Sequence, residues 1–137
     1  MTTIKQMPLR QTDGGRSQYF TANSVCDCVT RAIAIATSSD YKEVYDKIRA
    51  YVGYTPRNGI KHKDVCKLME YFGGTWHTCM TIGSGCHTHM NADELPTTGT
   101  IICNLSKHVS CVIDGVIHDT FDPSRFGMRC VYGYWSF

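Results

Sequence analysis

The sequence predicts an α+β fold in which N-terminal helices pack on a C-terminal antiparallel sheet. Before residue 73, apolar residues recur at helical spacing in three segments. After residue 75, short runs rich in β-branched and aromatic residues are separated by turn residues. Helices that precede the strands, rather than alternating with them, are typical of the α+β class. At this length we expect one domain, residues 1–137, with residues 1–22 as an N-terminal arm or edge strand.

The first predicted helix lies in residues 23–37, NSVCDCVTRAIAIAT, where small and branched side chains after Cys28 form one apolar face. Two starting points remain open. Ser24 and Asp27 fit a capping box, whereas Asp27 acting as the N-cap makes Cys28 the first helical residue. In both cases Cys28 lies near the start of the helix, where the aligned peptide dipoles favour a thiolate. Cys28 is therefore a candidate nucleophile, and the alternative is a small buried apolar residue.

Two further helices are expected before the sheet. The second starts at the capping-box pair Asp40 and Glu43 and ends at Gly53. Its apolar stripe consists of Tyr41, Val44, Tyr45, Ile48 and Val52. The third spans residues 61–72, and its buried face consists of Val65, Leu68, Met69 and Phe72.

The predicted strands are short and separated by turns. They span residues 76–82, 99–105, 108–113, 116–121 and 129–135. Between two of them, Asp114-Gly115 is the strongest short hairpin signal. A two-residue loop fixes the register, so Ser110 is expected opposite Asp119, and His108 opposite Phe121.

This register places His108 and Asp119 on the same face as Ser110, Val112, Ile117 and Phe121. Asp119 is then a diagonal neighbour of His108, roughly 5–8 Å away, which is within reach of a side-chain hydrogen bond. A carboxylate bonded to one ring nitrogen fixes the tautomer and leaves the other nitrogen to act on a thiol. Together with Cys28, the pair predicts the site of a cysteine hydrolase. The alternative is a solvated polar edge of the hairpin.

Two other sets of residues offer an alternative nucleophile or candidate metal ligands. Cys26 is an alternative nucleophile, but Cys28, not Cys26, shares the apolar stripe expected to face the sheet. Cys79, Cys86, His87 and His89 offer enough soft ligands for zinc. Their spacing does not match the paired C-x2-C knuckles that make a strong zinc signal, so an ordinary surface loop is the competing interpretation.

The composition excludes several classes of protein. A formal net charge of +2 without a block of Lys or Arg does not suggest a nucleic-acid partner. No apolar run is long enough to cross a membrane, and the N-terminus lacks the hydrophobic segment of a signal peptide. We therefore expect a cytoplasmic protein without a cofactor, in which most of the eight cysteines are free thiols. Among them, Cys103 and Cys111 lie in apolar runs typical of core strands.

Residues 23–52 and 99–122, including DCVTRAIAIAT and HVSCVIDGVIHDT, resemble the small papain-like cysteine hydrolases common in tailed-phage genomes. More distantly, they are similar to bacteriocin-leader peptidases. The resemblance implies a papain-like fold with Cys28 as nucleophile, His108 as general base and then acid, and Asp119 as the residue that orients His108. It also implies an oxyanion-binding side chain before the cysteine, for which Asn23 is the best match.

Two positions depart from the family pattern. Asn23 does not have the usual spacing from the cysteine, and Lys107 stands before His108 where a small residue is expected. The resemblance implies a peptidase, isopeptidase or amidase that forms a thioester, encoded by a phage and acting on a protein or peptide in the host cytoplasm. Transfer of the acyl group to an amine is a related outcome. The alternatives are a catalytically degenerate binding module that inhibits a host protein, and a zinc-stabilised binding protein.

Overall fold

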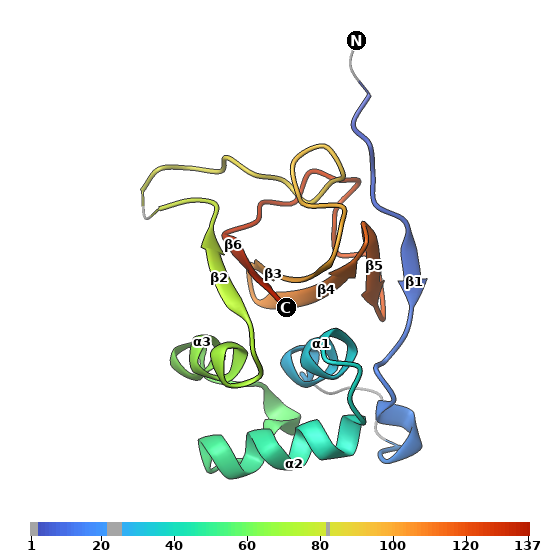
Figure 1. Cartoon of the computed structure of the whole chain (residues 1–137), viewed down its shortest axis with the longest axis vertical. Coiled ribbons are helices and arrows are strands. Elements are labelled where there is room, and N and C mark those ends of the chain that lie inside the picture. The colour runs from blue at the N-terminus through green and yellow to red at the C-terminus, as the bar shows by residue number, and fades with distance from the viewer. Residues whose placement is uncertain (1–2, 22–25, 82) are drawn as a thin grey trace.

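The computed structural model describes residues 3–21, 26–81 and 83–137, and shows an α+β chain (Figure 1). The helices are α1 (Cys28–Ala36), α2 (Tyr41–Val52) and α3 (His62–Tyr71), with two short 3-10 turns at Arg16–Gln18 and Pro56–Asn58. The strands are β1 (Leu9–Gln11), β2 (Thr75–Thr78), β3 (Thr100–Leu105), β4 (His108–Ile113), β5 (Val116–Asp119) and β6 (Gly133–Ser136). None of the helices in the described ranges is both long and apolar enough to span a membrane.

The six strands form one sheet in the order β1-β5-β4-β3-β6-β2. The predicted antiparallel sheet is wrong at one edge, because β1 pairs with β5 in parallel and makes the sheet mixed. All three residues of β1 are exposed, so no hydrophobic alternation marks this strand in the sequence. By pairing with β5, the arm covers a strand edge that would otherwise expose unpaired backbone groups.

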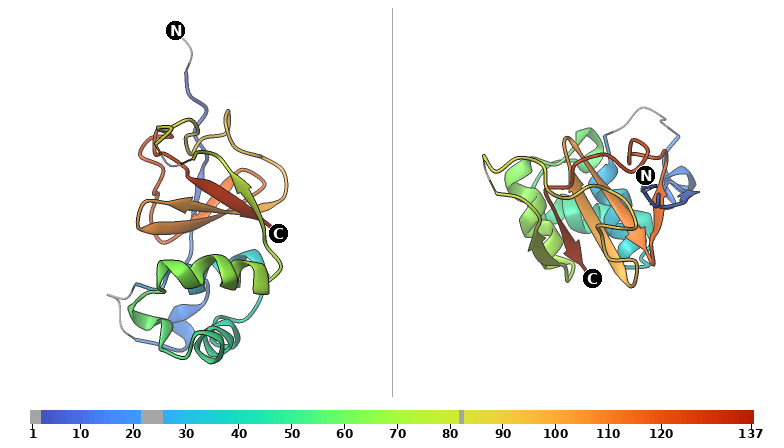
Figure 2. Two further views of the ribbon diagram at one scale, coloured as in Figure 1. Left: turned by 90° about the vertical axis from the view of Figure 1, so that its left-hand side faces the viewer. Right: turned by 90° about the horizontal axis from the view of Figure 1, so that it is seen from above.

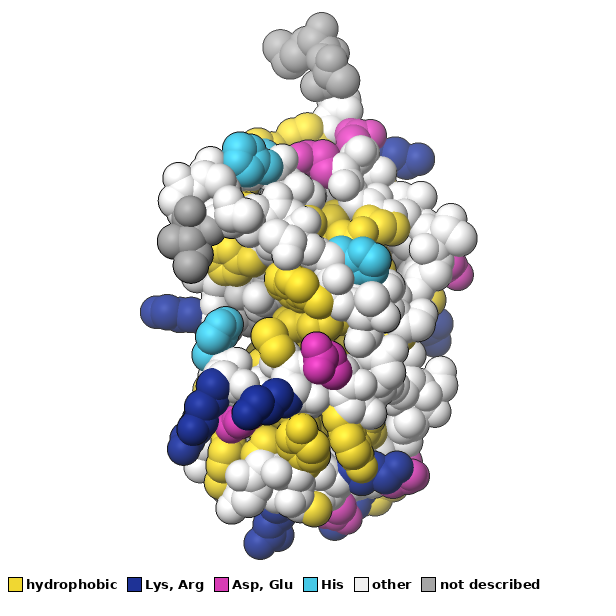
Figure 3. Space-filling model, turned by 60° about the vertical axis from the view of Figure 1, so that its left-hand side comes forward, with side chains coloured by type: hydrophobic (Ala, Val, Ile, Leu, Met, Phe, Trp, Pro, Cys, Tyr) yellow, Lys and Arg dark blue, Asp and Glu magenta, His cyan; other side chains and the backbone are white. Residues whose placement is uncertain are grey.

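Several predicted strand boundaries are also wrong. The strands expected at 76–82 and 129–135 shrink to β2 and β6, and the second hairpin strand ends at Asp119 rather than at residue 121. All four residues of β2 are exposed, so its sequence carries little information about where the strand ends. Figure 3 brings forward the side of the molecule that holds β2 and α3. Hydrophobic side chains lie along the middle of this face.

The helix boundaries agree well with the local sequence signals. Asp27 is the N-cap of α1, so Cys28 is the first helical residue, and Ser24 lies outside the described residues. The Asp40 carboxylate accepts a hydrogen bond from the Glu43 backbone N–H at 3.2 Å, as the capping box predicts. Gly53 ends α2 in the left-handed conformation, with φ of 82°.

The sheet separates two apolar cores. The helices cover one face, and the loops that contain residues 83–99 and 120–132 lie over the other (Figures 1 and 2). The core beneath the helices contains Val29, Ala32, Ile33, Val44, Ile48, Val65, Leu68, Met69, Ile102, Val109, Cys111 and Trp135, among others. The core beneath the loops contains Met7, Met90, Leu95, Ile101, Cys103, Leu105, Val112, Ile117 and Val131. Because α1 packs between the sheet and α2, its position relative to the strands is fixed from both sides.

Candidate active site

The N-terminus of α1 brings Cys28 to the start of β4, where His108 is the first residue of the strand. Both side chains are partly buried, and both line the same two hollows in the surface. The two residues are far apart in the sequence, and the packing of α1 against β3 and β4 brings them together.

The hairpin has the predicted register. Cys111 pairs with His118, Val112 with Ile117 and Ile113 with Val116, on either side of Asp114-Gly115. Asp114 and Gly115 both have positive φ, at 49° and 79°, as a two-residue loop of this type requires.

Asp119 accepts two side-chain hydrogen bonds from the same face of the hairpin. His108 Nε2 lies 2.7 Å from Asp119 Oδ2, and the Ser110 hydroxyl donates to the same oxygen at 2.7 Å. The Phe121 ring packs against His108, with ring centroids 5.2 Å apart. Since Nε2 is engaged by the carboxylate, Nδ1 is the ring nitrogen that remains for Cys28.

The protonation states of the pair follow from these contacts. Burial raises the pKa of the Cys28 thiol, but hydrogen bonds from His108 and the Val109 backbone, with the charges of His108 and Arg31, lower it below its usual value. Burial lowers the pKa of His108, yet its hydrogen bonds to Asp119 and Cys28 and their negative charges raise it to about 9. These shifts favour a thiolate beside an imidazolium ion, which is the reactive form of a cysteine nucleophile.

The pKa of Asp119 is shifted in the opposite direction to that of His108. Burial raises it, but hydrogen bonds from His108 and Ser110, the positive charge of His108 and the Thr120 backbone N–H lower it below the ordinary value. Asp119 therefore stays ionised at neutral pH and supports the positive charge on His108.

A buried network of ion pairs and hydrogen bonds lies next to this site and contacts Asp119. Arg31, on α1, forms a close ion pair with Asp27 through Nη1, and its Nη2 lies 3.5 Å from Asp119 Oδ1. The Tyr41 hydroxyl donates to Asp27 at 2.7 Å, and Asp27 is only 2% exposed. Asp27 thus faces Arg31 and Tyr41 instead of capping the backbone of α1. The network links the helix that carries Cys28 to the strand that carries Asp119.

Two hollows meet at the cysteine. One, of about 350 Å³, has a largely apolar lining that includes Val29, Ile60, Val65, Leu105 and Trp135. The other, of about 330 Å³, is lined by Arg16, Arg31 and Lys107, by Asp27, which pairs with both arginines, and by Thr120 and Phe121. A chain bound across Cys28 would therefore contact a largely apolar surface on one side and a more polar surface on the other.

Among the remaining candidate site residues, the structure describes Cys26 and Lys107 but not Asn23. Cys26 is exposed and precedes α1, so it does not occupy the helix N-terminus, although it lines both hollows. Asn23 lies outside the described residues. Lys107 adopts a positive φ of 58° in the β3–β4 turn and lines both hollows beside His108.

Of the four residues considered as zinc ligands, Cys86 and His89 lie close together, whereas Cys79 and His87 do not join them in the part of the chain that the structure describes. Cys79 packs against the core beneath the loops, and Cys86 forms a disulfide with Cys130. The other six cysteines are free, as predicted for most of them, and Cys103 and Cys111 are buried.

Three residues of the site were not predicted from the sequence. The hairpin register places Ser110 on the correct face but gives it no role, the helix pattern assigns Tyr41 only to an apolar stripe, and no sequence expectation involves Arg31. Asp27 and Arg31 stand four residues apart, a spacing that brings side chains together on a helix. This signal could have suggested the ion pair, but not its burial or its contact with Asp119.

Comparisons with known protein families, with curated proteins and with solved structures found no match for this chain.

Proposed function

We propose that the protein is a cysteine hydrolase with a papain-like arrangement, in which Cys28, His108 and Asp119 form the catalytic triad. The observation that carries the proposal is the buried hydrogen bond between the His108 ring and the Asp119 carboxylate, with His108 and Cys28 lining the same two hollows. A buried histidine–aspartate pair next to a cysteine that is open to two hollows suits nucleophilic catalysis. If the histidine–aspartate contact were only a solvated surface pair, we would expect neither side chain to be buried and no cysteine beside the histidine.

In the proposed reaction, the Cys28 thiolate attacks the acyl carbon of an amide or ester, and the carbonyl electron pair moves to the oxygen. The backbone N–H groups at the start of α1 point toward this end of the helix, and that of Cys28 would bind the oxyanion. When the tetrahedral intermediate collapses, the bond to the leaving group breaks and His108 gives its proton to that group. Cys28 is left as a thioester.

The second half of the reaction regenerates the thiolate. Neutral His108 takes a proton from water, the resulting hydroxide attacks the thioester carbon, and the C–S bond breaks to release a carboxylic acid. An amine in place of water would give acyl transfer. Asp119 holds the ring in position and stabilises its positive charge in both halves.

We further propose that the substrate is a protein or peptide in a host cytoplasm, as expected if the gene belongs to a phage. The six free cysteines support a reducing compartment, and the disulfide between Cys86 and Cys130 is the exception. The largely apolar hollow and the more polar one would suit a peptide with an apolar side chain on one side of the scissile bond and a polar one on the other.

A small activated ester tests the chemistry without knowledge of the natural substrate. We expect p-nitrophenyl acetate to transfer one acetyl group to Cys28, with a burst of nitrophenolate followed by slower turnover, detected by absorbance and intact-protein mass spectrometry. Cys28→Ala should abolish the burst, whereas Cys26→Ala should retain it. If acetylation maps to Cys26, or is spread over the exposed thiols, the assignment of Cys28 is wrong. If no thiol is acylated, the protein is better described as a binding module.

A further inference from the structure

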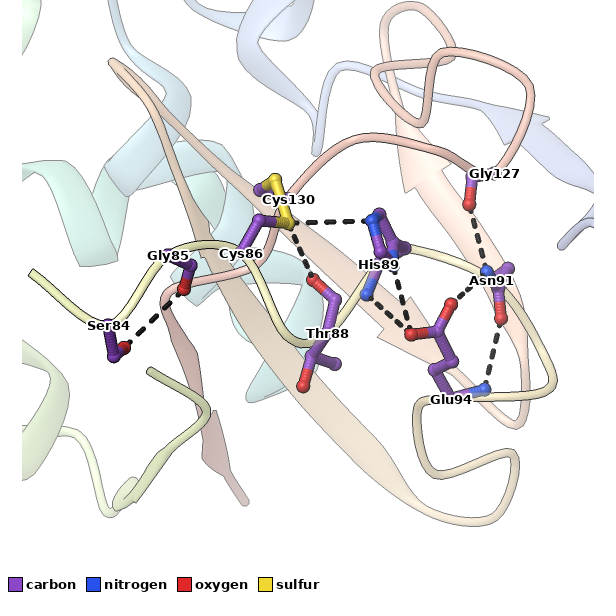
Figure 4. Close-up of a disulfide and its surroundings, with 9 residues drawn as sticks. All are labelled: Ser84, Gly85, Cys86, Thr88, His89, Asn91, Glu94, Gly127 and Cys130. Atoms are coloured by element: carbon purple, nitrogen blue, oxygen red, sulfur yellow. Dashed lines mark hydrogen bonds and ion pairs between the residues drawn. A yellow bond between two sulfur atoms is a disulfide. The ribbon is translucent and has the colours of Figure 1, made fainter. Parts of the chain in front are cut away.

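A second cluster of reactive side chains lies on the loop side of the sheet, away from Cys28. Among the described residues, the ligand atoms of Cys86, His89 and Cys130 all lie within 4.8 Å of one another. Figure 4 shows the imidazole of His89 directed at the sulfur of Cys86, with Nε2 and Sγ 3.5 Å apart. Cys86 is exposed, so ions and reductants in solution can reach the cluster.

The backbone places these three residues side by side. His89 and Cys130 form an antiparallel bridge, flanked by hydrogen bonds from Val131 N–H to the Thr88 carbonyl and from Met90 N–H to the Arg129 carbonyl, both 2.9 Å. In such a non-hydrogen-bonded pair, opposite side chains lie especially close. Cys86 precedes His89 by three residues, a spacing that lets both side chains approach one ion.

His89 is held by a second layer of hydrogen bonds. Glu94 Oε1 lies 3.0 Å from His89 Nδ1 and also accepts from the His89 backbone N–H at 3.1 Å. The Asn91 amide donates to Glu94 Oε2 at 2.6 Å and to the Gly127 carbonyl at 2.9 Å, and Asn91 is only 1% exposed. A carboxylate that accepts from Nδ1–H leaves the Nε2 lone pair free and fixes its direction.

A disulfide alone does not require an imidazole oriented toward its sulfur by a buried amide and a carboxylate. A histidine that binds a metal usually donates its other ring N–H to a carboxylate in the same way. Two thiolates and one imidazole are the ligands preferred by zinc and similar soft divalent ions.

We propose that Cys86, His89 and Cys130 bind one zinc-type divalent ion when the bond between the two cysteines is reduced. Two electrons from a thiol reductant break the S–S bond, two protons form the Cys86 and Cys130 thiols, and the reductant becomes a disulfide. The ion then replaces both thiol protons, which pass to solvent, while His89 donates its Nε2 lone pair. Water or an external ligand completes the tetrahedral coordination, and the ion holds the 83–98 loop to the segment before β6 in place of the disulfide.

Cobalt(II) and zinc(II) titrations test the proposal on the full chain. The Cys28→Ala variant serves as the background, so that metal binding at the thiol–imidazole pair of the candidate active site does not contribute. The protein is reduced with a water-soluble phosphine, which takes an oxygen atom from water as it is oxidised, and the phosphine is then removed without oxygen. We expect one cobalt ion per reduced chain with the absorption bands of a tetrahedral thiolate complex, displacement by zinc, and no stoichiometric binding to the oxidised chain.

Single substitutions identify the ligands. Glu94→Gln should weaken zinc binding about 10–100-fold, because it removes the negative charge that orients His89. His89→Ala and Cys130→Ser each remove a ligand and should weaken binding by at least as much. His87→Ala and Cys79→Ser are the matched controls and should bind as the background does. The proposal is overturned if the reduced chain binds no stoichiometric metal. Binding that survives His89→Ala, or that is lost with His87→Ala or Cys79→Ser, would also overturn it.

Discussion

Replacing His108 by alanine is expected to slow the acylation of Cys28 by roughly 10²–10⁴-fold, the usual contribution of a general acid–base group. The variant loses the proton acceptor for the thiol and the cation that stabilises the thiolate. It also removes one of the close hydrogen-bond partners of Asp119. The measurement is the burst rate with p-nitrophenyl acetate at neutral pH.

His77→Ala is the matched control for this experiment. His77 lies on the exposed strand β2 at one edge of the sheet, with Nε2 2.8 Å from the Ser136 hydroxyl, and it lines neither of the hollows around Cys28. Its removal should change the burst rate little. Equal losses in the two variants, or an unchanged rate in His108→Ala, would contradict the role assigned to His108.

Replacing Arg31 by methionine is expected to lower the free energy of unfolding by about 3–5 kcal/mol, the usual cost of removing one partner from a buried ion pair. Arg31 contacts both Asp27 and Asp119, whose side chains are 1% and 3% exposed. Without the guanidinium group, two buried carboxylates lose their shared cation. Urea unfolding followed by tryptophan fluorescence measures the change, because Trp135 is buried in the core.

Lys42→Met provides the control for Arg31→Met. Lys42 and Asp46 form an ion pair with the same four-residue spacing as Asp27 and Arg31, but both side chains are about half exposed. Solvent screens this pair, so its loss should cost less than about 0.5 kcal/mol. If Arg31→Met is no more destabilising than Lys42→Met, the buried network does not support the fold as described.

The His108–Asp119 contact could be predicted because it depends on local rules. A two-residue loop at Asp114-Gly115 fixes which residues face each other, and alternation fixes which side chains share a face. The helical positions of α1 and the cap of α2 follow from similar short-range signals. These rules describe each element accurately but contain no information on how elements separated along the chain meet.

The features that were not predicted depend on tertiary structure. β1 is short and exposed, so only the free edge of β5 makes it a strand. Cys86 and Cys130 are 44 residues apart, and their pairing depends on two loops that cross the same face of the sheet. Arg31 has a local partner in Asp27, but its contact with Asp119 exists only because α1 packs beside β5.

The most direct test of the central claim is the rate at which Cys28 is alkylated by iodoacetamide as a function of pH. The thiolate is the reacting species, so the rate follows its fraction. In the wild-type protein we expect the rate to rise with an inflection below the ordinary thiol pKa of about 8.5. A second change should appear near pH 9, where His108 loses its proton and the thiolate loses its cationic partner. In His108→Ala, the first inflection should move up to the ordinary range or above it, because burial of the thiol is then less opposed. A wild-type inflection at or above the ordinary value, unchanged in His108→Ala, would contradict the account of an activated Cys28.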